Sequence, residues 1–386
     1  MTADPRPLAG VVVVDLTRVL AGPYCTLVLA NLGARVIKVE RPPAGDDARG
    51  IGPFVGGKSL YFAALNHGKE SIALDLGERD DRALFERVLG AADVLVENFR
   101  PGVLDRLGYG WPSLHTRWPR LVYAATSGFG QTGPLRERPA FDMVAQAMGG
   151  ILSLTGYPDG PPARVGVSIG DITAGLFTAI GVLAALGKRR DTGAGTMVDV
   201  AMLDCQLAIL ENALTTHLVT GAVPGRLGTR HPNIAPFQAF TAGDGAMVVI
   251  CAGHDAHFAA LCTAIDRPEL RADARFTTPD ARRRHADALE AEVGAALRER
   301  PAAAWLERLE RAGVPCAPVN TVADAARCPQ AAARGMVVGI PDPAIGTLWV
   351  AGNPVKLADV PEPAARRAPP ELDADRAAIL TWLGGK

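Results

Sequence analysis

The sequence has few of the features that mark nucleic-acid-binding, secreted or membrane proteins. Its 386 residues carry a formal net charge of −1, and this balance argues against a nucleic-acid-binding protein, which usually has a basic surface. The apolar runs are much shorter than the roughly 20 residues that a bilayer requires. The N-terminus has no signal-peptide pattern. We therefore expect a cytoplasmic protein with neither nucleic acid nor membrane as a partner.

The sequence is also poor in residues arranged to hold a metal or a disulfide. The six cysteines are scattered and form no CxxC pair, which indicates reduced thiols packed in the core. His254 and His257 stand three residues apart, but no Cys or Glu at ligand spacing completes a zinc site. The sequence therefore predicts neither a metal site nor a redox cofactor.

Three glycine or serine motifs of common enzymes are missing. The segment after the first predicted strand contains only Gly22 where a nicotinamide-binding fold has GxGxxG, and Pro23 favours a helix start instead. The glycine-rich segment 127–134 lacks the Gly-Lys-Ser/Thr ending of a phosphate-binding P-loop. It predicts a flexible turn or a loop that brings backbone close to a ligand. No GxSxG motif of a serine hydrolase is present.

The first half of the chain alternates strand-like and helix-like segments. Predicted strands cover residues 11–15, 35–40, 71–76, 92–97 and 121–126, and predicted helices cover 22–32 and 81–89. Such alternation is typical of an α/β fold with a doubly wound parallel sheet.

The length of the chain predicts two domains. Pro and Gly residues between 224 and 232 predict a linker. We expect a large domain over residues 1–205, completed by about 330–386, and a smaller α+β domain over 225–325. Within these, the sequence predicts a strand at 247–251, helices at 255–265, 282–297 and 302–312, an extended segment at 359–370, and a last helix at 373–383.

The clearest predicted helix covers residues 171–188. Its apolar residues recur every three or four positions, and a surface loop is predicted over 187–195. Asp171 follows Gly170 at the predicted start, where a residue of this type commonly caps the helix. The helix macrodipole stabilises an ionised carboxylate there. Asp171 is therefore either a simple cap or a reactive carboxylate.

Several motifs together resemble the class III coenzyme A transferase family, also called the CaiB/BaiF family, and its formyl-CoA transferases in particular. They include VDLTRVLAGP at 14–23, LGARVIKVER at 32–41, VENFRPG at 96–102 with LDRLG at 104–108, and FDMVAQAMGG at 141–150. Residues 127–134, 170–171 and 198–204 also match, in the family's order, and weaker similarity continues at 231–236 and 312–316.

The resemblance implies an acyl-CoA:carboxylate CoA-transferase in which Asp171 is the nucleophile, working through anhydride and aspartyl-CoA thioester intermediates. It implies that coenzyme A is bound by Leu20, Ala21, Arg41, Leu74, Asn98, Phe99, Arg100, Arg106, Ala140, Phe141 and Asp142. Arg41 and Arg106 suit the nucleotide phosphates, because a guanidinium pairs with them bidentately. Coenzyme A and acyl-CoA would be substrates, with no separate cofactor. The family also implies an interlocked homodimer.

Two positions depart from the family's branches. Leu20 and Phe141 stand where formyl-CoA:oxalate transferases have Gln and Tyr, which argues against formyl and oxalate as substrates. Leu20 and the segment 128–134 look more like family members that use dicarboxylates, with succinyl-CoA as an example of the donor. The 2-methylacyl-CoA racemase branch has a catalytic His in place of Phe141, and a phenyl ring cannot exchange a proton. The alternatives are a racemase-type isomerase, a nicotinamide-dependent oxidoreductase, and a CoA-binding protein without turnover.

Overall fold

The computed structural model describes residues 4–363 and 365–385, and the chain divides into two compact units. The larger unit consists of Met1–Leu152, Arg164–Ala222 and Gln330–Lys386, and the smaller unit of Ser153–Ala163 and Val223–Pro329. Residues 153–163 thus lie with the smaller unit, whereas the sequence placed them in the large domain. One reason is a hydrogen bond from the Gly228 N–H to the Gly156 carbonyl, which ties this segment to the linker.

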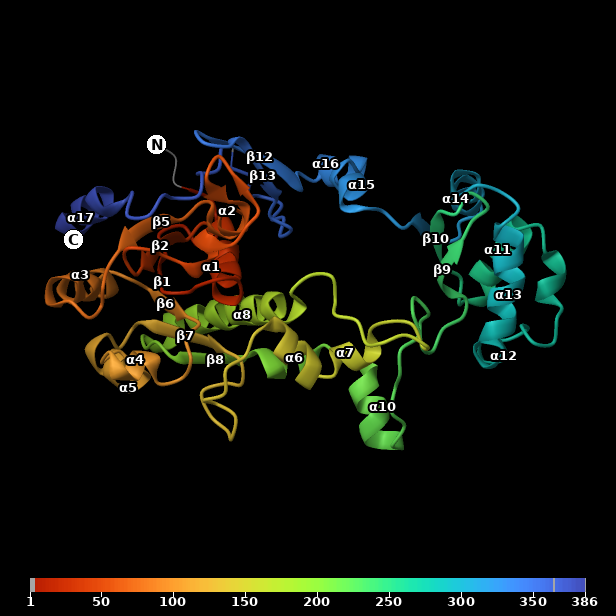
Figure 1. Ribbon diagram of the computed structural model, residues 1–386, viewed down its shortest axis with the longest axis horizontal. Coiled ribbons are helices and arrows are strands. Elements are labelled where there is room, and N and C mark those ends of the chain that lie inside the picture. The colour runs from red at the N-terminus through yellow and green to blue at the C-terminus, as the bar shows by residue number, and fades with distance from the viewer. Residues whose placement is uncertain (1–3, 364, 386) are drawn as a thin grey trace. The chain divides into compact units, whose positions relative to one another are not determined.

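The larger unit is built on a six-stranded parallel sheet (Figure 1). Its strands are β1 (Val12–Asp15), β2 (Arg35–Glu40), β5 (Glu70–Ala73), β6 (Val94–Glu97), β7 (Val122–Ser127) and β8 (Met197–Ala201). The spatial order is β5-β2-β1-β6-β7-β8. Counted along the chain this order is 3-2-1-4-5-6, so the direction of winding reverses between β1 and β6. The predicted α/β class with a parallel sheet is confirmed.

Helices cover both faces of this sheet. Because side chains alternate along a strand, Val13 and Val36 face helices α1 (Ala21–Asn31) and α8 (Ile169–Thr192), and their neighbours Val14 and Ile37 face the opposite side. That side is covered by α3 (Arg79–Gly90), α5 (Trp111–Arg117) and α17 (Arg376–Gly384). Burial on both faces explains why these strands are nearly continuous runs of apolar residues.

Helix α8 is longer at both ends than the sequence predicted. It begins at Ile169, with Ser168 as the N-cap residue, so Asp171 is its third residue and not its cap. It continues to Thr192 and ends at Gly193, which has a φ of 74°. The predicted loop at 187–195 is therefore wrong over 187–192. The basic residues there fit a last helical turn, where the macrodipole favours cations, and Arg189 pairs with Asp93 at 2.8 Å.

Within the described residues, α8 is the one helix whose length and hydropathy would suffice to cross a membrane. A core helix of a soluble protein passes the same test. Ala179, Val182 and Ala185 of α8 are buried against the sheet and α1, so packing accounts for much of its apolar character. The expectation of no membrane partner stays a prediction.

Shorter elements complete the larger unit. They are η1 (Asp47–Gly50), β3 (Phe54–Val55), β4 (Lys58–Ser59), α2 (Leu60–Asn66), α4 (Val103–Arg106), α6 (Asp142–Met148), α9 (Met202–Ala208), α10 (Asn212–Thr220), β12 (Val337–Asp342) and β13 (Gly346–Ala351). Helix α7 (Ile151–Leu154) crosses the boundary, because Ser153 and Leu154 belong to the smaller unit. Strands β12 and β13 form an antiparallel hairpin, which packs on Ala63 of α2 through Ile340 and Leu348. Helices α15 (Val322–Ala326) and α16 (Pro329–Ala333) lie where the chain passes between the units.

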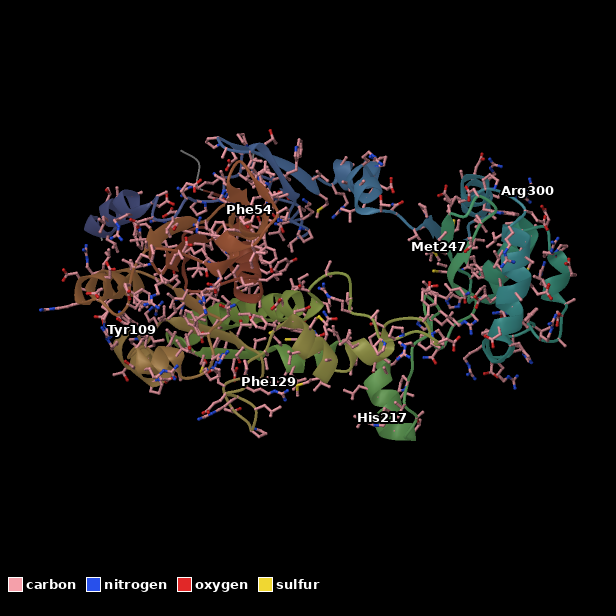
Figure 2. All side chains as sticks on the ribbon, viewed as in Figure 1. Phe54, Tyr109, Phe129, His217, Met247 and Arg300 are labelled. Carbon is pink, nitrogen blue, oxygen red and sulfur yellow. The ribbon has the colours of Figure 1, made fainter. Side chains whose placement is uncertain are left out.

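The smaller unit is an α+β arrangement around an antiparallel sheet in the order β11-β10-β9. Its elements are β9 (Phe237–Thr241), β10 (Met247–Cys251), α11 (Asp255–Ala264), η2 (Pro268–Arg271), α12 (Pro279–Arg284), α13 (Ala286–Leu297), α14 (Ala302–Arg311) and β11 (Cys316–Pro318). Met247 and Arg300, labelled in Figure 2, mark the start of β10 and the turn between α13 and α14. The single helix predicted over 282–297 is interrupted at His285.

Candidate active site

The loops after β1 and β6 diverge where the strand order reverses, which is where open α/β sheets bind ligands. The two loops are joined by a pair of hydrogen bonds. The backbone N–H of Arg18 donates to the Asn98 side-chain carbonyl at 2.8 Å, and the Asn98 amide donates to the Arg18 carbonyl at 2.8 Å. Asn98, one of the predicted CoA-site residues, therefore fixes the geometry of this crevice.

Three cavities open in this region, and Arg100 lines all of them. The first, of about 670 Å³, also contains the predicted residues Arg41, Leu74 and Phe99. The second, of about 630 Å³, contains Arg106. The third, of about 240 Å³, is lined by Leu20, Ala21, Asn98, Phe99, Ala140, Phe141 and Asp171. The structure thus brings the sequence-predicted residues together, although their role in binding stays a prediction.

The arginines differ in how firmly they are held. The Arg41 side chain is 81% exposed, and its guanidinium lies 3.7 Å from the Asp75 carboxylate, so a phosphate can displace this weak pairing at little cost. Arg100 and Arg106 are exposed as well. Leu74, by contrast, is buried and forms an apolar wall of the first cavity. A cavity with an apolar wall and arginines at its rim suits a nucleotide base with phosphates.

Asp171 is a half-buried carboxyl group in the first turn of α8. Burial, and secondarily the charge of Asp142, raises the pKa of Asp171 to about 7. The sequence argument from the macrodipole favoured its ionised form. Burial and the charge of Asp142 both act in the opposite direction and favour the neutral form.

Asp142 lies next to Asp171 and holds the start of α8. One carboxylate oxygen accepts the Gly170 N–H at 2.8 Å, and the other accepts the Gln146 side-chain amide at 2.7 Å. The Arg164 guanidinium is 3.7 Å away. Asp142 is 8% exposed, and the third cavity is lined by its neighbour Phe141. These contacts support the first turn of α8, and the contact of Asp142 with coenzyme A that the resemblance implied stays a prediction.

Sequence reasoning missed several residues of this site. The loop after β7, which carries Phe129 (Figure 2), also supplies Arg136 and Arg138 to the third cavity. In the sequence these two arginines belong to a local cluster of charged residues, and such a cluster is equally typical of a solvated surface. Tyr61 of α2 was missed because its neighbours come from other elements. Burial and the charges of Asp171 and other carboxylates raise the pKa of Tyr61 to about 12.

Across residues 4–363 and 365–385, no group of three or more His, Cys, Asp or Glu side chains is arranged to hold a metal ion.

The sheet is doubly wound, and arginine-lined cavities open at its switch point next to a carboxyl group of raised pKa. This combination is typical of an α/β enzyme for large anionic substrates. Comparison with known families is more specific. The model of the family described as CoA-transferase family III matches residues 8–376. The chain belongs to CoA-transferase family III.

Relatives with assigned names are similar over nearly the whole chain. An acetyl-CoA:oxalate CoA-transferase of Acetobacter aceti is 49% identical over 98% of this chain and 96% of its own length. A succinyl-CoA:mesaconate CoA-transferase of Haloarcula hispanica is 40% identical over 96% of this chain and 95% of its own. The crystal structure of a CaiB/BaiF family protein from Brucella suis has a TM-score of 0.87 at 40% identity and covers 98% of this chain and 99% of its own.

These findings confirm the resemblance inferred from the motifs. The chain is a CoA-transferase, and the names of these two relatives each pair an acyl-CoA with a carboxylic acid. The nicotinamide-dependent alternative is wrong, although the strand order alone is the one that dinucleotide-binding folds use.

Proposed function

We propose that this chain transfers coenzyme A from an acyl-CoA to a carboxylic acid with Asp171 as the covalent nucleophile. The observation that carries the proposal is the position of Asp171, in the first turn of α8 and in one cavity with seven of the predicted CoA-site residues, Arg100 among them. A carboxyl group with a pKa of about 7 is substantially ionised at neutral pH. It is also more basic than an ordinary aspartate, which favours nucleophilic attack.

The reaction proceeds through two kinds of covalent intermediate. An Asp171 carboxylate oxygen attacks the thioester carbonyl carbon, the carbon–sulfur bond breaks, and a mixed anhydride and the CoA thiolate result. The thiolate then attacks the aspartyl carbonyl of the anhydride, releasing the first acid and leaving an aspartyl-CoA thioester. The incoming carboxylate repeats these two steps in reverse and departs as the new acyl-CoA. Each covalent intermediate retains the group-transfer potential of the original thioester, and water must be excluded throughout.

The arginines serve binding in this scheme. The exposed guanidinium groups of Arg41, Arg100 and Arg106 line the two larger cavities, where they pair with the phosphates of coenzyme A. These phosphates are remote from the reacting carbon, so they contribute similarly to the ground state and the transition state.

For the acids, we propose that at least one partner of the exchange is a dicarboxylate. The names of the relatives from Acetobacter and Haloarcula pair acetyl-CoA with oxalate and succinyl-CoA with mesaconate. Arg136 and Arg138 line the cavity of Asp171 and offer positive charge for a second carboxylate. The argument against oxalate from Leu20 and Phe141 is opposed by the oxalate-specific name of the 49% identical relative, so oxalate belongs in any acceptor panel.

We also propose that the enzyme is a homodimer. Leu176, Phe177, Ile180 and Leu183 of α8 are exposed apolar side chains on one helix, and a contiguous apolar face of this kind favours association. Light scattering coupled to gel filtration tests this proposal, and a monomer at micromolar concentration would contradict it.

The test of the nucleophile compares two substitutions in the same helix. Asp171→Ala is expected to lower kcat by at least about 10³-fold while the protein still folds and binds coenzyme A, because a nucleophile acts on chemistry more than on ground-state binding. Asp191→Ala removes an exposed aspartate near the other end of α8 and serves as the control. Hydroxylamine added during turnover should attack the activated Asp171 carbonyl, displace the acid or coenzyme A, and leave a hydroxamate at Asp171. Residual turnover near the wild-type rate in Asp171→Ala would sink the proposal.

A second experiment separates transferase from racemase chemistry. The enzyme is incubated with (2R)-2-methylacyl-CoA in deuterated water without an acceptor acid. We expect no deuterium at the α-carbon and no inversion, because Phe141 offers no proton-transferring group. Rapid exchange with inversion, and no transfer to any acid in the panel, would favour the isomerase.

A further inference from the structure

The loop between β1 and α1 contains a strained residue beside the candidate active site. Val19 has a φ of 67°, in the left-handed region that a β-branched side chain rarely adopts. Such a conformation persists only where the surrounding structure enforces it, and strain of this kind gathers at functional sites. Val19 itself lines the cavity that contains Asp171.

One buried ion pair enforces this conformation. The Val19 N–H donates to the Asp46 carboxylate at 3.0 Å, and the Lys38 ammonium lies 2.8 Å from the other Asp46 oxygen. The same ammonium donates to the Thr17 carbonyl at 2.7 Å. Both charged side chains are fully buried, at 0% exposure. The pair therefore grips the loop on either side of Arg18, through Thr17 and Val19.

The pair is part of a balanced set of charges on the α1 side of the sheet. Glu40 pairs with Arg49 at 2.7 Å, and Asp15 pairs with Lys69 at 3.1 Å. With Lys38 and Asp46, the set holds three cations and three carboxylates. Asp15 and Glu40 also act on Lys38 and help to raise its pKa, against the effect of burial. Loss of Asp46 would therefore not leave the Lys38 ammonium without a nearby negative charge.

The loop leads directly into groups that face Asp171. Leu20 is the N-cap residue of α1, and no side chain of the described residues caps this helix. Leu20 and Ala21 line the cavity of Asp171. On the other side, a Cβ at Gly175 of α8 would lie only 2.6 Å from the Ala21 carbonyl oxygen, so α1 and α8 cross in close contact. The first turn of α1 is thus set between α8 and the loop that Asp46 holds.

We propose that Lys38 and Asp46 are positioning residues that keep Val19 left-handed and so hold the backbone N–H groups of Leu20 and Ala21 beside the carbonyl that reacts at Asp171. The proposal rests on the proposed function, and it adds how the negatively charged oxygen of the tetrahedral intermediate is stabilised. Backbone donors fixed in advance stabilise the charge of a tetrahedral intermediate without reorganising during the reaction. A loop free to relax at Val19 loses that alignment while the phosphate-binding arginines stay in place.

The first test removes the anchor and compares it with a matched buried carboxylate. Asp46→Ala is expected to lower kcat by about 30-fold, part of the 10²–10³ that a lost oxyanion donor costs. The KM for acyl-CoA should change by less than about threefold, since binding energy remote from the reaction is untouched. Asp342 has the same features, a fully buried carboxylate that pairs with Lys58 at 2.8 Å and accepts two backbone N–H groups. Asp342→Ala should keep kcat within about twofold of the wild type.

The second test uses the strain itself. Glycine adopts the left-handed conformation freely, so Val19→Gly makes the anchor less necessary. When Val19→Gly is already present, we expect Asp46→Ala to lower kcat by only about threefold. The left-handed conformation costs valine a free energy that corresponds to about tenfold in a rate, and glycine does not have this cost. If Asp46 only stabilises the fold, the effects of Val19→Gly and Asp46→Ala on kcat should instead multiply independently. If Asp46→Ala does not fold, Asp46→Asn enters the same cycle, since it keeps the size but sets an amide against the Lys38 ammonium.

The outcomes distinguish this proposal from the proposed function. Wild-type enzyme without transferase activity, or activity that survives Asp171→Ala, defeats the proposed function. Suppose instead that the wild-type enzyme is active and that Asp171→Ala is not. The positioning proposal is then overturned if Asp46→Ala and Asp342→Ala lower kcat equally. It is also overturned if Asp46→Ala lowers kcat by the same factor in the wild type and in Val19→Gly. A kcat-specific loss that Val19→Gly relieves supports it.

Discussion

The two units of this chain have interiors of different kinds. The larger unit buries charged side chains in number: Asp15, Lys38, Glu40, Asp46, Lys69, Glu97, Asp142, Asp342 and Asp375. In the described part of the smaller unit, Arg282 is the one charged side chain that is buried, within a core of aliphatic and aromatic residues such as Phe258, Leu261 and Trp305. Burial of charge is thus concentrated in the unit that carries the candidate site.

The difference teaches what the buried charges do. Removing a charged group from water costs more than its pairing usually returns, so an apolar core is the cheaper way to stabilise a fold. The smaller unit follows that route. In the larger unit the buried groups reach backbone atoms of the loops at the switch point. Lys38 contacts Thr17, Asp46 contacts Val19, and Glu97 accepts the Phe99 N–H. These contacts specify loop positions that apolar packing alone does not define.

The largest effect on stability should come from breaking the interior of the larger unit. The Lys69 ammonium donates to Asp15 and Pro23 at 3.1 Å and to Thr26 and Asn66 at 2.8 Å. Lys69→Met removes this donor and leaves the buried Asp15 carboxylate without its ion-pair partner, which is expected to lower the free energy of unfolding by about 3–5 kcal/mol. Urea denaturation followed by circular dichroism measures the loss. A loss below about 1 kcal/mol would show that this interior is no more sensitive than an ordinary core.

A smaller effect is expected from the one buried cation of the smaller unit. Arg282 donates to the Phe276 carbonyl at 3.0 Å and the Gly253 carbonyl at 2.9 Å, and pairs with Asp255 at 2.7 Å. The Asp255 side chain is 71% exposed, so water solvates it when the arginine is lost. Arg282→Met should therefore cost only about 1–3 kcal/mol, mainly for the two carbonyls. The same urea titration applies, and a cost equal to that of Lys69→Met would break the comparison between the units.

Replacing the candidate nucleophile should stabilise the protein, whereas the two substitutions above destabilise it. Burial, chiefly, raises the pKa of Asp171 from its ordinary value of 3.8 to about 7 in the folded protein. Its ionised form therefore disfavours folding, and the penalty grows as pH rises from about 4 and is complete above about 7. Asp171→Asn should raise the free energy of unfolding by about 1–3 kcal/mol at pH 8 and leave it unchanged near pH 4. Thermal melts at both pH values test this, and equal melting temperatures at pH 8 would contradict the raised pKa.

The sequence predicted the frame of the larger unit well. Strands β1, β2, β6 and β7 are short β-branched or apolar runs buried on both faces, and this pattern has few other interpretations. The ends of α8 were harder to place. Ser168 competes with Asp171 as a cap, and the basic residues after Gly187 serve equally well in a loop and in a last turn. Local preference does not choose between such options, and tertiary packing does.

The sequence predicted the residues of the site only where they belong to motifs of the family. Lys38 stands in a strand where a lysine is usually exposed, yet its partners Thr17 and Asp46 make it a buried residue. The raised pKa of Asp171 depends on a burial that the sequence does not show. Tyr61 and Arg138 reach the site from α2 and from the loop after β7. Such convergence of distant segments follows from topology and not from any local pattern.

The smallest effect should come from the exposed ion pairs that surround the smaller unit. Asp266 is the strongest case, because its carboxylate lies 2.7 Å from Arg308 and 3.6 Å from Arg300. The hydrogen bond from Arg308, with further help from the surrounding arginines, lowers the pKa of Asp266. Any stabilisation is therefore present above about pH 4 and lost as pH falls below it.

Asp266→Asn is a clean way to remove this charge. Asp266 has a φ of 59°, and asparagine tolerates the left-handed region as well as aspartate does, so the backbone does not confound the result. Solvent screens an exposed pair, and we expect the melting temperature at pH 7 to fall by less than about 2 °C, and by less still in 0.5 M salt. A fall of 5 °C or more that salt abolishes would show that the smaller unit relies on its surface charges as the larger unit relies on its buried ones.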